Sequence, residues 1–150
     1  MKNTKHYFII AILLLLVSCG LKPIESDYQF IDSEIETIKL DDLGNGKILI
    51  HNGANVFHKI DETSSLNIWI NDRPAGQLKA SEYVIIKLNE GSNTLRLLHK
   101  DVVNMRSEHH ITINDSTKII MVKPTITSNK LEVTNEFPRN WHKFSYKSSQ

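Results

Sequence analysis

The densest group of side chains able to bind a metal or transfer a proton is Glu108-His109-His110. The surrounding residues predict a β-strand, in which successive side chains point to opposite faces, so His109 and His110 cannot bind one ion from the same surface. Glu108 and His110 share a face, and His99 on a neighbouring strand could join them. Zinc requires three or four well-placed ligands, which this spacing alone does not provide. We therefore expect solvated strand histidines and no metal site, with a zinc site as the alternative.

Other catalytic patterns are weak. The sequence contains neither a Gly-x-Ser-x-Gly elbow nor a Ser-x-x-Lys motif. The adjacent acids at positions 41–42 and 61–62 lie in loop-like sequence, where solvation is the simpler explanation than a carboxyl pair held across a cleft. Gly44-Asn45-Gly46 lacks a third glycine and precedes a strand, so it predicts a turn instead of a phosphate-binding loop. We expect no enzyme activity, no catalytic residue and no cofactor.

The single cysteine of the chain follows a short apolar segment. Lys2 and Lys5 precede an unbroken apolar and aromatic run over residues 7–17, which is too short to cross a bilayer core and is typical of a secretory signal. The run ends in Leu16-Val17-Ser18-Cys19, which resembles a bacterial lipobox. The resemblance implies a diacylglycerol thioether on Cys19, fatty acids such as palmitate, and removal of a signal peptide over residues 1–18. A plain signal peptide with an incidental cysteine, or a short buried helix, is the alternative.

Composition restricts the environment and the partners. With one cysteine in 150 residues, no disulfide can form within the chain, and a formal charge of +1 gives no electrostatic reason to expect nucleic-acid binding. The mean hydropathy of −0.28 excludes a multi-span membrane protein. We expect a bacterial envelope protein held to the membrane by acyl chains on Cys19. Gly20 stands where an inner-membrane retention signal would have aspartate, which favours the outer membrane if two membranes are present.

The rest of the chain divides into a tether and a β domain. Residues 19–46 are expected to form a lipidated linker, in which Ile31, Ile35 and Ile38 could line a short helix. From Lys47 onward, short runs rich in Ile, Val, Thr and aromatic residues alternate with Asn, Asp, Gly and Ser clusters. Residues 47–150 therefore predict an all-β fold, an antiparallel sandwich of about seven strands.

The order of strands and turns is similar to a known group of small envelope lipoproteins. Ile68-Trp69-Ile70-Asn71-Asp72 leads to Gly76-Gln77-Leu78, Tyr83 opens a strand, and Gly91 lies in a turn before Leu95 and Leu97. This layout, from Lys47 to Val133, resembles the lipoproteins catalogued as domain-of-unknown-function 2846. It departs from them at Glu90-Gly91-Ser92-Asn93, where a Pro-Gly-x-His turn is expected. The resemblance implies an Ig- or transthyretin-like sandwich and supplies no catalytic residues.

Four residues are candidates for contact with a partner. Trp69 lies on the strand face opposite Ile68 and Ile70, where it could fill a second core or anchor a partner. The candidates are Trp69, Asp72, Arg73 and Trp141. The segment around Trp141 mixes cations and aromatic residues, and an edge strand is its simplest interpretation. We expect a non-catalytic module that binds or scaffolds an unknown envelope protein or polymer. A periplasmic inhibitor or immunity-type protein against a secreted enzyme is the alternative.

Overall fold

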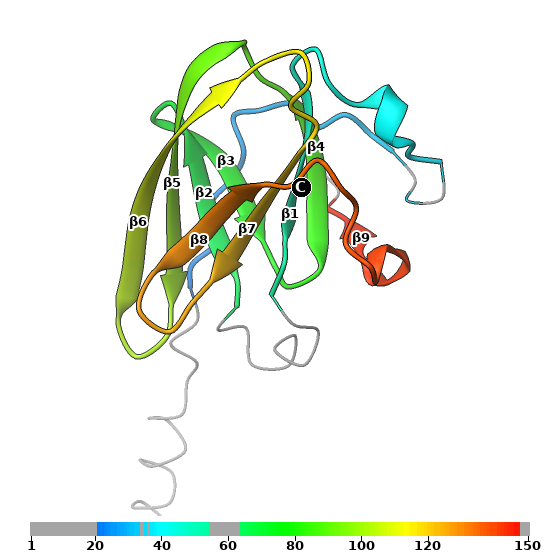
Figure 1. Cartoon of the computed structure of the whole chain (residues 1–150). Helices are drawn as coiled ribbons and strands as arrows, with labels where there is room; N and C mark the ends of the chain where they lie inside the picture. The colour runs from blue at the N-terminus through cyan, green and yellow to red at the C-terminus, as the bar shows by residue number, and fades with distance from the viewer. Residues whose placement is uncertain (1–20, 34, 36, 55–63, 148–150) are drawn as a thin grey trace, which may run out of the picture.

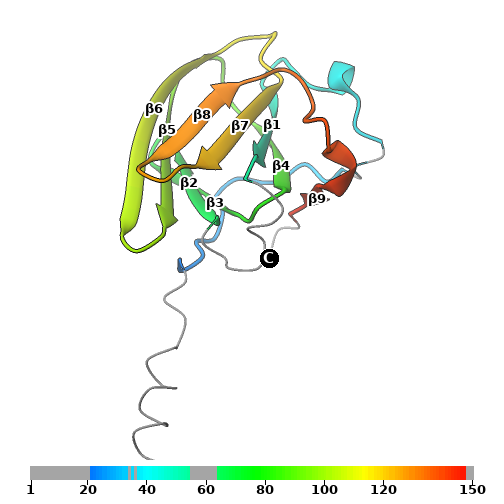
Figure 2. The same cartoon turned by 60° about the horizontal axis from the view of Figure 1, so that its bottom comes forward.

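Two β-sheets pack face to face in the computed structural model, which describes residues 21–33, 35, 37–54 and 64–147 (Figures 1 and 2). The strands are β1 (Lys47–Asn52), β2 (Leu66–Ile70), β3 (Arg73–Leu78), β4 (Glu82–Lys87), β5 (Gly91–Lys100), β6 (Asn104–Ile113), β7 (Ile119–Pro124), β8 (Asn129–Val133) and β9 (Ser145–Tyr146). Within the same ranges, two 3-10 helices, η1 (Leu40–Asp42) and η3 (Trp141–Lys143), flank them. The all-β sandwich expected from the sequence is confirmed. Within the described ranges, no helix has the length and apolar character required to cross a bilayer.

The strand count and the pairing differ in detail from expectation. One sheet has the order β8-β7-β1-β4-β9 and the other β3-β2-β5-β6, which makes nine strands among the described residues instead of about seven. Pro74 lies near the start of the edge strand β3, where a missing N–H is tolerated. Two pairs, β1 with β7 and β4 with β9, run parallel, so the sandwich is not purely antiparallel.

The main core lies between the two sheets. Alternating residues of each strand point inward, as the period of two in the sequence predicted. Ile48 and Ile50 of β1 face Ile68 and Ile70 of β2, and all four are at most 1% exposed. Burial of each such side chain contributes about 1.5–3 kcal/mol to folding. The central strands of the two sheets therefore form the stable core of the sandwich.

A second apolar cluster covers the outer face of the five-stranded sheet. Leu49, Tyr83, Ile85 and Ile119 point outward from this sheet and are buried by segments from both ends of the described chain. The covering side chains include Ile31, Ile35, Ile38 and Leu40 from the N-terminal side, and Phe137, Trp141 and Phe144 from the C-terminal side. The three isoleucines that suggested a helical face instead pack here, and no α-helix occurs in the described part of residues 28–43.

The N-terminal segment is docked along β3 as well. The carbonyl oxygens of Leu21 and Lys22 accept hydrogen bonds from Gln77 Nε2 at 3.3 Å and Asn67 Nδ2 at 2.9 Å. Further along, Ser26 forms a β-bridge with Ala75. The part of the expected linker that the structure describes is thus packed on the sandwich.

Asn129 connects the two sheets. Its Nδ2 donates to the carbonyl oxygens of Leu97 and Met105, at 3.3 and 3.1 Å, and its Oδ1 lies 2.7 Å from His99 Nδ1. Asn129 belongs to β8 in one sheet, whereas its partners belong to β5 and β6 in the other. This buried amide holds the β7–β8 hairpin against the β5–β6 hairpin.

Candidate functional site

The outer face of the four-stranded sheet carries the candidate site. Trp69 of β2 pairs in register with Arg96 of β5, and Arg96 pairs with Glu108 of β6. One step along the sheet, Leu98 pairs with Arg106. Because side chains on a strand alternate, all five of these residues point away from the core. We call this surface, defined by Trp69, Arg96, Leu98, Arg106 and Glu108, the open face.

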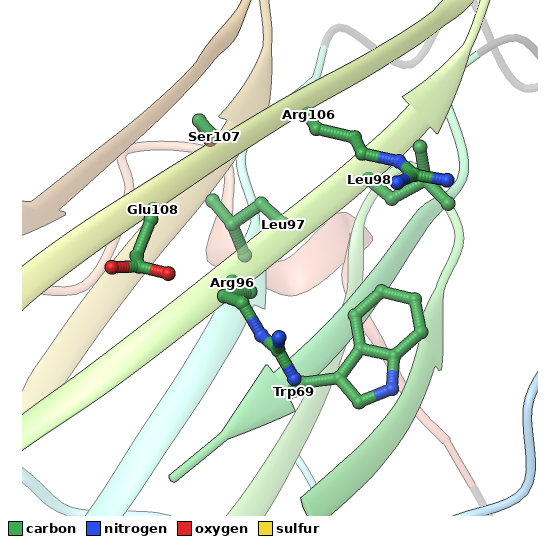
Figure 3. Close-up of a pocket in the computed structure, with 7 residues that line it drawn as sticks. All are labelled: Trp69, Arg96, Leu97, Leu98, Arg106, Ser107 and Glu108. Carbon is green, nitrogen blue, oxygen red and sulfur yellow. The ribbon is translucent and has the colours of Figure 1, made fainter. Parts of the chain in front are cut away.

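A shallow groove of about 610 Å³ crosses the open face (Figure 3). Trp69 and Leu98 supply its apolar surface, and Arg96 and Arg106 supply its guanidinium groups. Figure 3 shows the Arg96 side chain extending toward the indole of Trp69. An indole beside two guanidinium groups presents apolar area together with donors for carboxylate oxygens.

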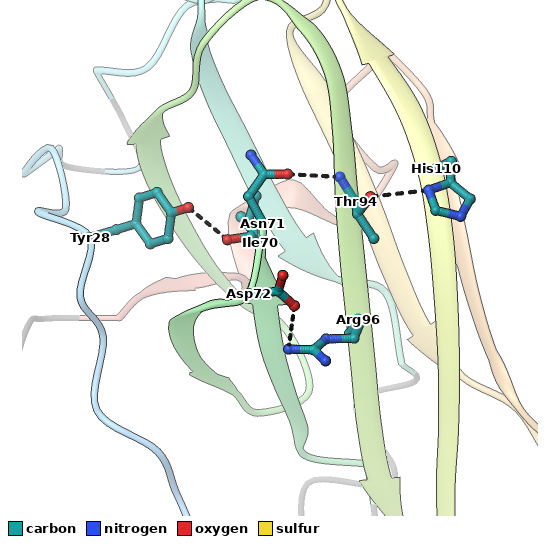
Figure 4. Close-up of polar contacts among 7 residues, drawn as sticks. All are labelled: Tyr28, Ile70, Asn71, Asp72, Thr94, Arg96 and His110. Atoms are coloured by element: carbon teal, nitrogen blue, oxygen red, sulfur yellow. Dashed lines mark hydrogen bonds and ion pairs between the residues drawn. The ribbon is translucent and has the colours of Figure 1, made fainter.

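The β2–β3 turn fixes the position of Arg96 (Figure 4). Asn71 and Asp72 both adopt positive φ angles, of 49° and 65°, a tight-turn geometry that these residue types tolerate. The turn places Asp72 Oδ1 2.9 Å from an Arg96 terminal nitrogen, and Asn71 Oδ1 accepts the Thr94 backbone N–H at 2.9 Å. Because both charged side chains are substantially exposed, this ion pair mainly orients Arg96 and adds little to stability.

Arg106 differs from Arg96 in having no hydrogen bond or ion pair with any residue of the described ranges. The nearest acid on its own strand, Glu108, pairs instead with His110 Nε2 at 3.4 Å. His110 Nδ1 in turn lies 3.0 Å from Thr94 Oγ1. The two guanidinium groups of the open face therefore differ. Asp72 orients that of Arg96, whereas the donors of Arg106 are available.

The three residues considered for a metal site do not meet. Glu108 and His110 lie on the outer face as predicted, but His99 points inward, is 3% exposed and contacts Asn129. The strand offset between β5 and β6 pairs His99 with Met105, which places its ring on the opposite side of the sheet. Within the ranges described, no group of three His, Cys, Asp or Glu side chains could hold a metal ion.

The other candidate contact residues lie elsewhere. Arg73 stacks over the Tyr28 ring, 4.6 Å from its centroid, and donates to the Asp27 carbonyl oxygen at 2.9 Å. Trp141 belongs to the second apolar cluster on the opposite side of the molecule, with ring centroids 4.7 Å from Tyr83 and 5.3 Å from Phe144. Of the four, only Trp69 and Asp72 belong to the open face or contact it. Cys19 lies outside the described residues.

A buried histidine, His51, packs against the C-terminal segment. His51 Nδ1, Ser81 Oγ and Trp141 Nε1 are buried and have no hydrogen-bond partner among the described residues. The ring of His51 contacts Phe144 edge to face, with centroids 5.2 Å apart. Desolvation lowers the pKa of His51 from its usual 6.5 to about 4. Because the ring is buried and its pKa is lowered, the protonation of His51 is coupled to the stability of the fold.

His51 predicts a loss of stability in acid. The unfolded chain binds a proton near pH 6.5 whereas the folded chain resists it down to about pH 4, so the free energy of unfolding should fall as the pH drops through this range. We expect a loss of up to about 3 kcal/mol, measured by urea denaturation at pH 7 and pH 4. His51→Gln should remove that part of the slope, and His142→Gln, at an exposed position, should keep it. An unchanged slope in His51→Gln would contradict this account.

Sequence reasoning missed Arg96, Leu98 and Arg106. A strand was expected around Glu108-His109-His110, but β6 begins earlier, at Asn104, and so includes Arg106. The overlooked signal is that the polar residues Arg106, Glu108 and His110 recur at every second position. Even with this strand assigned, the register that places Arg106 beside Leu98 could not be read from one sequence.

The described residues form a β-sandwich in which the chain itself covers the outer face of one sheet and leaves the open face of the other sheet exposed. No family model, curated protein or solved structure matches this chain. The resemblance to the domain-of-unknown-function 2846 lipoproteins stays a prediction from the sequence.

Proposed function

We propose that the protein is a lipid-anchored envelope protein whose β-sandwich binds a partner, without catalysis, through the open face. The observation that carries this proposal is the contrast between the two outer sheet faces. The chain's own apolar side chains cover the outer face of the five-stranded sheet, whereas Trp69 and two arginines line a groove on the four-stranded sheet that no described residue covers. A large aromatic beside arginines is the composition that dominates binding hot spots.

The chemistry of the groove favours an acidic protein segment as the occupant. A guanidinium group binds a carboxylate with two parallel hydrogen bonds, and Arg106 has its donors available. The indole and the Leu98 side chain offer apolar surface for the rest of the segment. Glu108, already paired with His110, lies at one border of the groove. Its negative charge would repel a carboxylate that bound there instead of at the arginines.

The proposed anchor makes weak contacts sufficient. A lipidated Cys19 would confine the sandwich to the membrane surface, where an envelope partner is present at high effective concentration. Support for this part comes from the signal-like residues 1–18 and the lipobox-like Leu16-Val17-Ser18-Cys19. An affinity in the micromolar range, about 8 kcal/mol, would be adequate under such confinement.

In-cell photocrosslinking tests the binding face. A photoreactive amino acid at Thr112, an exposed outward position on β6, should capture a partner, whereas one at Glu132 on β8 should not. Trp69→Ala and Arg106→Ala should each reduce the Thr112 product about tenfold, because loss of a hot-spot contact costs on the order of 1–2 kcal/mol. Arg139→Ala, an exposed arginine outside the open face, is the matched control and should leave the product unchanged.

The outcome also separates the proposed function from its alternative. Mass spectrometry should identify an acidic envelope protein in the Thr112 product. A secreted hydrolase captured there would instead favour the inhibitor or immunity-type function. Equal crosslinking from Thr112 and Glu132, or a Thr112 product insensitive to Arg106→Ala, would overturn the open face as the binding surface.

A further inference from the structure

Exposed apolar side chains gather at one end of the sandwich. Among the described residues, the exposed large hydrophobic residues are Val102 at 90%, Val103 at 56%, Ile126 at 88% and Val133 at 40%. Val102 and Val103 form the turn of the β5–β6 hairpin, and Ile126 lies in the turn of the β7–β8 hairpin. Val133 lies at the far end of β8. Single exposed apolar residues are common, but three on neighbouring turns are not explained by chance exposure alone.

The two turns are held side by side. Asn129, the first residue of β8, donates to the carbonyl oxygen of Met105, the second residue of β6, at 3.1 Å. Its contact with His99 fixes the other arm of the β5–β6 hairpin. Figures 1 and 2 show both hairpins turning at the same end of the molecule. We call this end, defined by Val102, Val103 and Ile126, the hairpin tips.

The described chain begins at this same end. Asn67, whose amide binds the Lys22 carbonyl oxygen, pairs in register with Leu98, two residues before the end of β5. Both figures show the blue start of the described chain beside the hairpins. Only Gly20 separates Leu21 from Cys19, and two residue steps span at most about 7 Å. Acyl chains on Cys19 would therefore enter the bilayer close to the hairpin tips.

Charged residues around the tips fit a lipid surface. Lys22 and Lys123 are exposed at this end and can meet anionic headgroups, with Asp101 as the acidic residue of the β5–β6 turn. Short apolar side chains projecting from a rigid pair of hairpins match the depth of the headgroup and upper acyl region.

We infer that the hairpin tips insert into the membrane interface, so that Val102, Val103 and Ile126 contact lipid and orient the sandwich on its anchor. This inference rests on the lipid anchor of the proposed function and deepens it by naming the surface that meets the bilayer. With this end on the membrane, the strands stand away from the surface, which leaves the open face accessible from the side.

Site-directed nitroxide labelling of the full anchored chain tests the contact. The protein is purified from bacterial membranes and reconstituted into vesicles of phosphatidylethanolamine and phosphatidylglycerol. Labels at Val102→Cys and Ile126→Cys should collide more often with oxygen, which concentrates in lipid, than with a water-soluble nickel chelate. A label at Ser92→Cys, an exposed position near the opposite end of β5, is the matched control and should show the reverse.

The same experiment distinguishes failure of the contact from failure of the anchor. Water-like accessibility at Val102 and Ile126 in protein that floats with the vesicles would overturn the contact and leave the anchor intact. The unmutated chain should take no label, because its only cysteine would be a thioether. A labelled unmutated chain that does not float with the vesicles would overturn the anchor and the contact together.

Discussion

Cys19→Ser is expected to yield a chain that incorporates no fatty acid and retains its first eighteen residues. A serine hydroxyl cannot replace the sulfur that would carry the diacylglycerol, and cleavage by the lipoprotein peptidase follows lipid attachment. Each buried CH₂ contributes about 0.8 kcal/mol to membrane binding. A single acyl chain therefore attaches a protein only marginally, whereas two or three chains hold it almost irreversibly. Metabolic labelling with a fatty acid and the mass of the purified chain measure both effects.

A conservative change at the neighbouring position is the control. Ser18→Ala keeps a small residue before the cysteine, so the chain should still be labelled and cleaved. Continued labelling of Cys19→Ser would refute the anchor, because no second cysteine exists to carry the lipid. Detergent phase separation gives an independent measurement, in which the acylated chain should enter the detergent phase.

Tyr83→Ala is expected to cause the largest loss of stability of any single change considered. Tyr83 has no exposed surface and lies at the centre of the second apolar cluster, with ring centroids 4.7 Å from Trp141 and 5.6 Å from Tyr146. Removing a buried aromatic ring costs about 3–5 kcal/mol, a large fraction of the 5–15 kcal/mol by which a typical domain is stable. Urea denaturation followed by far-UV circular dichroism measures the change.

Tyr83→Phe separates the ring from its hydroxyl. The Tyr83 hydroxyl donates to the Ser33 carbonyl oxygen at 3.0 Å, and burial raises its pKa to about 12, so the neutral donor persists at the pH of the measurement. Losing this hydrogen bond alone should cost about 1 kcal/mol. Equal losses for the two variants would mean that the hydrogen bond dominates. A negligible loss for Tyr83→Ala would contradict the role given to the second cluster.

The second cluster also explains why the expected linker is structured. Ile31, Ile35 and Ile38 suggested a helical face because apolar residues at intervals of four and three fit one side of a helix. The same side chains can fill an outer sheet face in irregular backbone, provided that the sheet presents Leu49 and Tyr83 outward. That surface is created only when β1 and β4 pair, with His51 opposite Tyr83 and Leu49 opposite Ile85.

The sequence alone determined the all-β class and the period of two that separates inward from outward residues, because strand alternation and turn residues are local properties. It did not determine strand register, the membership of β3 and β9, or which outer face would be covered, because those depend on contacts between residues far apart in the chain. Trp69 was recognised as an outward residue, yet its arginine neighbours come from β5 and β6 and meet it only through the registers of two strand pairs. The adjacency of Val102, Val103 and Ile126 likewise follows from the Asn129 contacts across the two sheets, which no local pattern encodes.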